Sequence, residues 1–123
     1  MNAGELKART KVFAHRCIRL CSVLPESYLA NHIKKQLLRC STSVAANYRA
    51  ACLAQSKGDF AAKLSIAIEE ADESAFWMEL IVDNKLFESE KLGTLIKEAG
   101  ELTAIFIASR KSIKDRSYEF TGS

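Results

Sequence analysis

The sequence predicts an all-α protein with the architecture of an antiparallel up-and-down four-helix bundle. Four segments of similar length repeat their apolar residues every three or four positions, as amphipathic helices do. The connections between these segments are short, so consecutive helices are expected to lie antiparallel and side by side. Only five glycines and one proline interrupt the 123 residues, which favours a few long helices over many short strands. A long helical hairpin is the competing architecture, but four separate stripes favour the closed bundle.

The first two helices are expected over residues 3–24 and 26–54, on either side of Pro25. Proline disfavours helix in the residue before it and can occupy the first turn of the helix that follows. The apolar stripe of the first helix comprises Leu6, Thr10, Phe13, Cys17, Leu20 and Leu24. The stripe of the second helix comprises Leu29, Ile33, Leu37, Cys40, Val44, Tyr48 and Ala51. Small residues are frequent between positions 40 and 52, which allows a neighbouring helix to approach closely.

The last two helices are marked by serine caps. Ser56 is expected to cap the third helix, with Asp59 in the position of a capping-box carboxylate, and Ser89 is expected to cap the fourth. The third stripe comprises Phe60, Leu64, Ala67, Ala71, Ser74, Met78 and Ile81, flanked by Ala61, Ile68, Ala75 and Val82. The fourth stripe comprises Leu92, Leu95, Ala99, Leu102, Phe106, Ser109 and Ile113. We therefore predict a single domain over residues 1–116, followed by a flexible C-terminal tail over residues 117–123.

Composition indicates a globular protein outside membranes. Hydrophobic residues make up 48% of the chain and charged residues 27%, and no apolar stretch is long enough for a transmembrane helix. Residues 1–19 are basic and amphipathic without the apolar core of a signal peptide, and a mitochondrial presequence is the weaker alternative. The four cysteines lie within apolar helical patterns, so we interpret them as reduced core residues of a cytoplasmic protein: Cys17, Cys21, Cys40 and Cys52.

A distinctive pattern lies between residues 36 and 80. It comprises Gln36, Leu37, Arg39, Ser43 to Arg49, Ser56, Lys57, Asp59, Phe60, Lys63, Leu64, Ile66, Ala67, Glu70, Ala71, Glu73, Trp77 and Leu80. The pattern resembles the four-helix bundle protein family whose members include those encoded by intervening sequences inside bacterial large-subunit ribosomal RNA genes. The chain departs from that family at Ala50, where an acidic residue usually follows Asn-Tyr-Arg.

This resemblance implies a homo-oligomeric bundle, often a pentamer. Relatives that act beside a reverse transcriptase in diversity-generating retroelements imply nucleic-acid and protein binding, and none is an established enzyme.

The residues themselves offer no arrangement for catalysis, a cofactor or a metal. Di-iron bundles need Glu-x-x-His pairs, but Val12 precedes His15 and Leu29 precedes His32 at that spacing. Two isolated histidines also form no Ser-His-Asp arrangement. The acidic cluster of the third helix has no nearby histidine, so we interpret it as a solvated face or as partners for arginines of the second helix: Glu69, Glu70 and Glu73. We therefore predict that the protein is not an enzyme, with no catalytic, cofactor-binding or metal-binding residue.

Two groups of residues remain as candidate contacts. Ser43 and Asn47 lie one turn apart among alanines and need hydrogen-bond partners if they are buried. With Arg49, and with Glu70 or Glu73 as partners, they favour an interhelical polar contact that sets register, and a ligand site is the alternative. Phe76 and Trp77 are typical of core packing, with an oligomer interface as the second interpretation because aromatic residues are enriched there.

Charge is divided unevenly along the chain. Residues 1–58 carry a net charge of +8 and residues 59–123 a net charge of −5. The halves can pair within one bundle, pair between subunits of a ring, or leave a basic surface for nucleic-acid phosphates. The basic residues of the third interpretation are Lys7, Arg9, Lys11, Arg16, Arg19, Lys34, Lys35 and Arg39.

We expect a homo-oligomeric scaffold or accessory factor, pentameric by resemblance, whose first two helices contact RNA or DNA phosphates. A protein-interaction module without a nucleic-acid role is the alternative, with another protein as the partner in place of nucleic acid.

Overall fold

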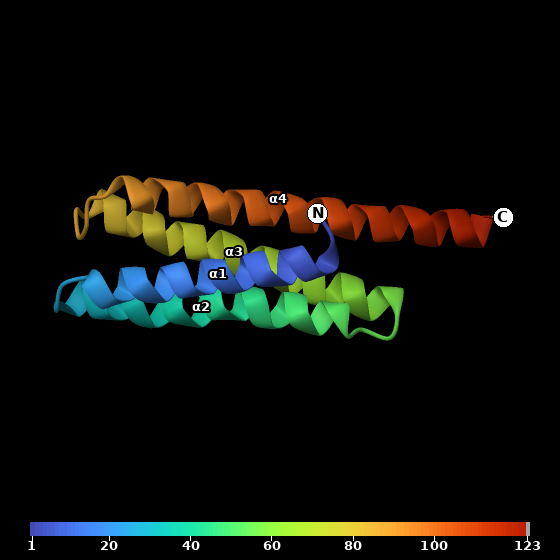
Figure 1. Ribbon diagram of the computed structural model, residues 1–123, viewed down its shortest axis with the longest axis horizontal. Coiled ribbons are helices and arrows are strands. Elements are labelled where there is room, and N and C mark those ends of the chain that lie inside the picture. The colour runs from blue at the N-terminus through green and yellow to red at the C-terminus, as the bar shows by residue number, and fades with distance from the viewer. Residues whose placement is uncertain (123) are drawn as a thin grey trace.

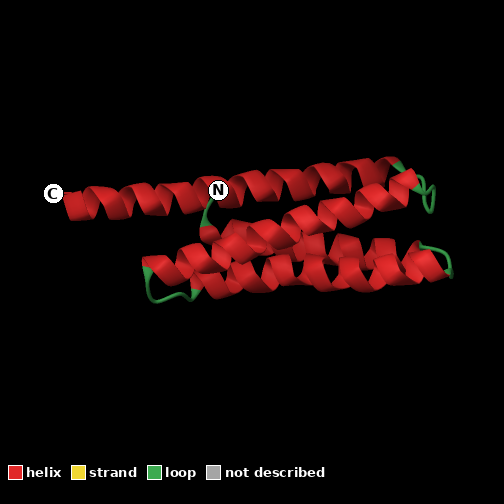
Figure 2. Cartoon of the chain, turned by 180° about the vertical axis from the view of Figure 1, so that it is seen from behind, coloured by secondary structure: helices red, strands yellow, loops and turns green. Residues whose placement is uncertain are grey.

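Four helices form the computed structural model, which describes the backbone of residues 1–122 and the side chains of residues 1–113. Their bounds are Ala3–Val23 (α1), Tyr28–Cys52 (α2), Lys57–Asp83 (α3) and Glu90–Gly122 (α4). The described residues contain no strand, so the all-α prediction is confirmed. Figure 1 shows the chain reversing its direction at each of the three connections, and Figure 2 shows how short these connections are. Contacts join α1 to α2, α2 to α3, α3 to α4 and α4 to α1, which makes the four helices a bundle.

Polar caps explain where the first three helices begin. The side chains of Asn2, Ser27 and Ser56 each accept a hydrogen bond from the backbone N–H three residues later. Such a bond satisfies one of the four N–H groups that a helix leaves open at its start. Because Ser27 caps α2, Pro25 lies in the connection and does not occupy the first turn of α2. The backbone N–H of Lys91 donates to Ser89 Oγ over 3.1 Å at the start of α4, as the sequence predicted.

Buried side chains follow the predicted stripes closely. The fully buried positions include Phe13, Leu37, Leu64, Met78 and Phe106. Leu29 is an exception, because its side chain is 39% exposed while that of Ala30 is 0% exposed. Ala30 and Ile33 are three residues apart and share the core face, which turns Leu29 towards the flank of α2. Val82, predicted to flank the third stripe, is also exposed.

The fourth helix is longer than expected. We expected it to end near Arg116, but α4 continues to Gly122, and no glycine or proline stands between residues 101 and 121 to stop it. Figure 1 shows its C-terminal part reaching beyond the ends of the other three helices. Ser109 and Ile113 of the predicted stripe are therefore only partly buried. The predicted flexible tail at 117–123 concerns residues whose side chains lie outside the described part, and it stays a prediction.

None of the helices, over the described residues, combines the length and the apolar character that crossing a membrane requires.

Candidate functional site

Arg9 joins α1 to α4 through the best-defined ion pair of the bundle. Its Nε donates to Glu98 Oε2 over 2.8 Å and its Nη2 to Glu98 Oε1 over 2.6 Å, with Glu101 Oε2 at 2.8 Å from Nη2. The hydrogen bond from Arg9 lowers the pKa of Glu98, and the same bond raises the pKa of Arg9. Arg9, predicted to contact nucleic acid, is therefore committed to a contact within the chain.

Arg39 forms the corresponding ion pairs between α2 and α3. Its Nη1 lies 3.1 Å from Glu70 Oε2, and its Nη2 donates to Glu73. Trp77 Nε1 also donates to Glu73 Oε2, over 3.1 Å. Glu70 and Glu73 of α3 therefore pair with an arginine of α2. This agrees with the second interpretation of the acidic cluster, in which it provides partners for arginines of the second helix. Arg39 is a second predicted nucleic-acid contact that pairs internally.

Ser43 and Asn47 make their contact within α2. Asn47 Nδ2 donates to Ser43 O over 2.9 Å and to Ser43 Oγ over 2.8 Å. The structure therefore divides the predicted polar group into three parts. Ser43 and Asn47 bond one another, Glu70 and Glu73 bond Arg39, and Arg49 lies on the other side of α2.

A buried thiol completes the α2–α3 contact. The ligand-type atoms of Cys40, Glu70 and Glu73 lie within 4.8 Å of one another, and Ser74 Oγ donates to Cys40 Sγ over 3.2 Å. Arg39 already pairs with both carboxylates, and burial raises the pKa of Cys40, which keeps its thiol protonated. The geometry fits an interhelical polar contact that holds register. The sequence signal that could have revealed it is the position of Cys40 and Ser74 on facing stripes.

Cys17 and Cys21 are poor nucleophiles. Burial raises the pKa of Cys17 to about 12 and that of Cys21 to about 11. A thiolate is the reactive form of cysteine, so these groups are inert at neutral pH. All four cysteines are free, and Cys52 is the one that is not fully buried, which agrees with the predicted reduced state.

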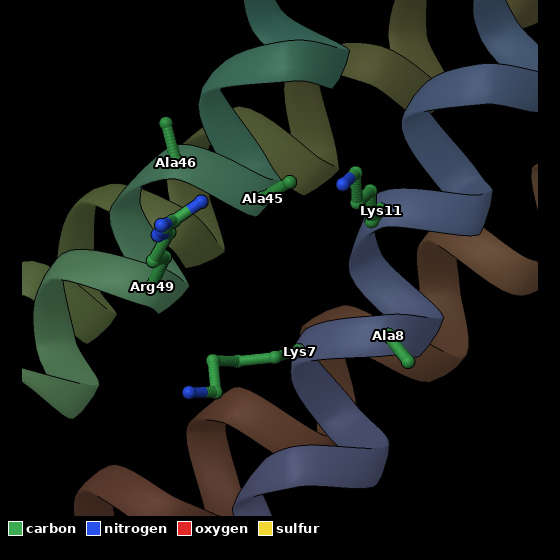
Figure 3. Close-up of a pocket in the computed structure, with 6 residues that line it drawn as sticks. All are labelled: Lys7, Ala8, Lys11, Ala45, Ala46 and Arg49. Atoms are coloured by element: carbon green, nitrogen blue, oxygen red, sulfur yellow. The ribbon is translucent and has the colours of Figure 1, made fainter.

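A cationic groove lies between α1 and α2 (Figure 3). It has a volume of about 460 Å³ and is lined by Lys7, Ala8, Lys11, Ala45, Ala46 and Arg49. Figure 3 shows the side chains of Lys7 and Lys11 extending from α1 towards α2. The alanines are short, so the walls leave room between the two helices.

The cations of this groove have no partner among the residues whose side chains the structure describes. Among the described residues, no hydrogen bond or ion pair engages the side chains of Lys7, Lys11 or Arg49, and the lining contains no carboxylate. Arg49 was missing from the sequence prediction of basic contacts, because the family pattern grouped it with Ser43 and Asn47. Its position one turn after Ala45, on the side of α2 that faces α1, is the signal that could have found it.

The remaining predicted cations differ in their surroundings. Arg16 donates to Thr94 Oγ1 over 3.2 Å, and Lys34 pairs with Glu26 over 3.3 Å. Arg19 and Lys35 are exposed and bond no carboxylate in the described part of the chain. The structure thus brings Lys7 and Lys11 together with Arg49, and separates them from Arg9, Lys34 and Arg39.

Phe76 and Trp77 lie on the outer side of the α2–α3 pair. Phe76 is 49% exposed, whereas Trp77 is partly buried and packs against the core. The two rings meet edge to face with centroids 5.1 Å apart, and Trp77 meets His32 in the same way at 5.5 Å. The oligomer contact predicted for these residues stays a prediction.

Comparisons with known proteins agree with the resemblance seen in the sequence. The model of the 23S rRNA-intervening sequence protein family matches residues 5–108. A crystal structure at 1.70 Å of a protein of unknown function from Bacteroides thetaiotaomicron, assigned to the S23 ribosomal protein family, is 32% identical. It matches with a TM-score of 0.78 over 90% of this chain and 99% of that chain. No curated protein matches. The chain belongs to the 23S rRNA-intervening sequence protein family.

Proposed function

We propose that this protein is a non-enzymatic, homo-oligomeric accessory protein of the cytoplasm that binds the phosphate backbone of RNA or DNA in the α1–α2 groove. One observation carries the proposal: Lys7, Lys11 and Arg49 share a groove in which no carboxylate of residues 1–113 neutralises them. Three cations without internal partners concentrate positive potential at one place on the surface.

The chemistry of the groove suits phosphate. The guanidinium of Arg49 can hold a phosphate group through two parallel hydrogen bonds, while the lysines act as point charges. The alanines Ala45 and Ala46 let a backbone approach α2 closely. Contacts to phosphate carry no sequence information, so binding is expected to be independent of sequence and sensitive to salt.

Internal pairing supports this choice of surface. Carboxylates of α3 and α4 neutralise Arg39 and Arg9 on the flanks of the basic half. The two carboxylates of residues 1–58 are also engaged, since Glu5 accepts from Asn2 and Glu26 from Lys34. The groove therefore stays positive even though the chain as a whole carries a net charge of only +3.

Assembly forms the other half of the proposal. The family resemblance favours a pentamer, and a ring would repeat the groove five times and raise affinity through multivalency. The exposed ring of Phe76 favours the second candidate, a protein-interaction module without a nucleic-acid role. Native mass spectrometry of the full chain at micromolar concentration tests the assembly directly. A pentamer is expected, and a clean monomer would overturn the oligomeric part.

A salt titration of nucleic-acid binding tests the groove. The variant Lys7→Gln/Lys11→Gln/Arg49→Gln removes its three cations. The matched control Lys85→Gln/Lys97→Gln/Lys111→Gln removes three exposed cations elsewhere, so both variants have the same net charge. For a single-stranded 20-mer, each lost phosphate contact lowers the slope of log K against log[salt] by about 0.7.

For the groove variant, we expect the slope of log K against log[salt] to be smaller in magnitude by about 2 than for the wild-type protein. Its affinity at low salt should also be clearly lower. The control should keep the slope of the wild-type protein. If the two variants have the same salt slope and the same affinity, the groove is not the binding site. Absence of binding by the wild-type protein at low salt would remove the nucleic-acid role and favour the protein-interaction module.

A further inference from the structure

A second hollow opens between α1 and α4. It has a volume of about 550 Å³ and is lined by Arg16, Arg19, Leu20, Val23, Phe87, Ser89, Lys91 and Leu95. Its described lining combines four apolar side chains, one of them aromatic, with three cations and Ser89, and contains no carboxylate. A hollow of this composition suits a planar apolar group that is attached to an anion.

One ridge of α1 connects this hollow to the α1–α2 groove. Lys7, Lys11, His15, Arg19 and Val23 follow one another at intervals of four residues and are all exposed. At 3.6 residues per turn, each step of four residues moves about 40° around the helix, so the row crosses the outer surface of α1 diagonally. The row begins at the groove with Lys7 and Lys11 and ends at the hollow with Arg19 and Val23. Its length is about 24 Å at 1.5 Å per residue.

We propose that the ligand is single-stranded nucleic acid, whose backbone follows this ridge and whose unpaired base enters the α1–α4 hollow. The proposal rests on the function proposed above and adds the strand state of the ligand. Arg19, at the mouth of the hollow, contacts the phosphate next to the inserted base. Phe87 and the aliphatic side chains Leu20 and Val23 contact the base itself.

A single strand is the expected ligand because a base must leave its stack and its pairing partner before it can enter the hollow. In a duplex each base is paired and stacked, and extruding it costs free energy that an unpaired strand does not spend. Proteins that bind single strands combine a cationic path with an aromatic surface for bases, without preference for sequence. The ridge and the hollow provide these two elements on either side of Arg19.

Binding of a single-stranded 20-mer and of a 20-base-pair duplex to the full chain, at one salt concentration, tests this inference. The variant Phe87→Leu removes the aromatic ring but keeps an apolar side chain of similar size. The control Phe76→Leu makes the same change at an exposed ring on α3. We expect Phe87→Leu to weaken single-strand binding about tenfold and to leave duplex binding unchanged. Phe76→Leu should change neither.

Arg19 gives an independent measurement. Arg19→Gln should lower the single-strand salt slope by about 0.7, while the control Lys97→Gln, at an exposed position of α4, should leave it unchanged. A strand carrying 5-iodouridine can also be crosslinked by light to the wild-type protein, and this needs no variant to fold. Mass spectrometry should place a crosslink on Phe87, and crosslinks confined to other residues would overturn the inference.

The two proposals fail in different ways. Equal affinity of wild-type protein for single strands and duplex, or equal weakening of both by Phe87→Leu, overturns the base-binding hollow and leaves the phosphate groove intact. If the triple groove variant binds like its charge-matched control, the proposed function itself falls.

Discussion

At the scale of single residues, the pairing of each arginine decides its role. Arg9 and Arg39 point into carboxylate pairs, whereas Arg49 has no partner in the described part of the chain. The sequence analysis placed Arg9 and Arg39 among the basic contacts and Arg49 in the polar motif, because a helical pattern shows which residues share a face but not which neighbouring helix that face meets. Helix packing alone separates structural arginines from the one that is free to bind a ligand.

The pair between Arg9 and Glu98 should make stability depend on pH. The side chains are 27% and 15% exposed, so the pair is partly screened from water. The pKa of Glu98 is lowered in the folded state, so its contribution is complete above its ordinary pKa of 4.5 and is lost as pH falls through the folded value. We expect Glu98→Gln to reduce the free energy of unfolding by about 1 to 2 kcal/mol at pH 7. The difference from the wild-type protein should shrink as the pH falls below 4.5.

Urea denaturation followed by circular dichroism at several pH values measures this effect. Glu69→Gln is the control, because Glu69 is exposed and bonds no cation in the described residues. The control should change the free energy of unfolding by less than about 0.5 kcal/mol at every pH. A difference for Glu98→Gln that stays constant from pH 7 to pH 3 would show that charge at Glu98 does not stabilise the fold.

At the scale of helices, the sequence pattern predicted the four elements well and their ends less well. Nearly all stripe residues are buried, because a period of three or four residues leaves only one face for the core. The start of α2 and the end of α4 differed from expectation. Ser27 caps α2 and so sets its first residue at Tyr28, and the absence of glycine and proline between residues 101 and 121 lets α4 continue to Gly122.

The candidate site could be predicted only in part. Lys7 and Lys11, which line the groove, were among the basic residues that charge alone singled out. The hollow beside Phe87 is lined by residues of α1, of α4 and of the connection before α4, and no local pattern brings these three segments together. The polar contact of Cys40 with Ser74 was also hidden, because a cysteine on an apolar stripe resembles any small core residue.

The close contact between α2 and α3 depends on small side chains. Ala67 and Ala71 are fully buried on α3, which leaves no space for a longer side chain. Ala71→Leu should reduce the free energy of unfolding by about 1 to 3 kcal/mol through overpacking. Ala62→Leu, at an exposed position of the same helix, should change it by less than about 0.5 kcal/mol. Thermal unfolding of both variants checks this, and similar melting temperatures would show that the α2–α3 seam is loosely packed.

At the scale of the whole molecule, the charge division gives ion pairs between the helices and a surplus of cations for the phosphate binding that we propose. Carboxylates of α3 and α4 hold the bundle together by pairing with Arg39 and Arg9. The basic half carries more cations than these pairs consume, and the surplus lies on the outer side of α1 and α2. Repulsion among unpaired cations opposes folding, so a surface kept for binding phosphate should lower stability at low salt.

This trade-off gives a prediction that links stability to binding. Arg49→Gln relieves repulsion with Lys7 and Lys11, so we expect it to raise the free energy of unfolding by about 0.5 kcal/mol at low salt. The gain should vanish near 1 M salt, where the screening length is only about 3 Å. The same variant should weaken nucleic-acid binding, so stability and affinity change in opposite directions. Thermal unfolding at a fixed protein concentration, at both salt levels, measures the first effect. Lys97→Gln, at an exposed position of α4, is the control. If Arg49→Gln lowers the melting temperature at low salt, the guanidinium stabilises the fold, and the groove is a structural feature of the α1–α2 pair.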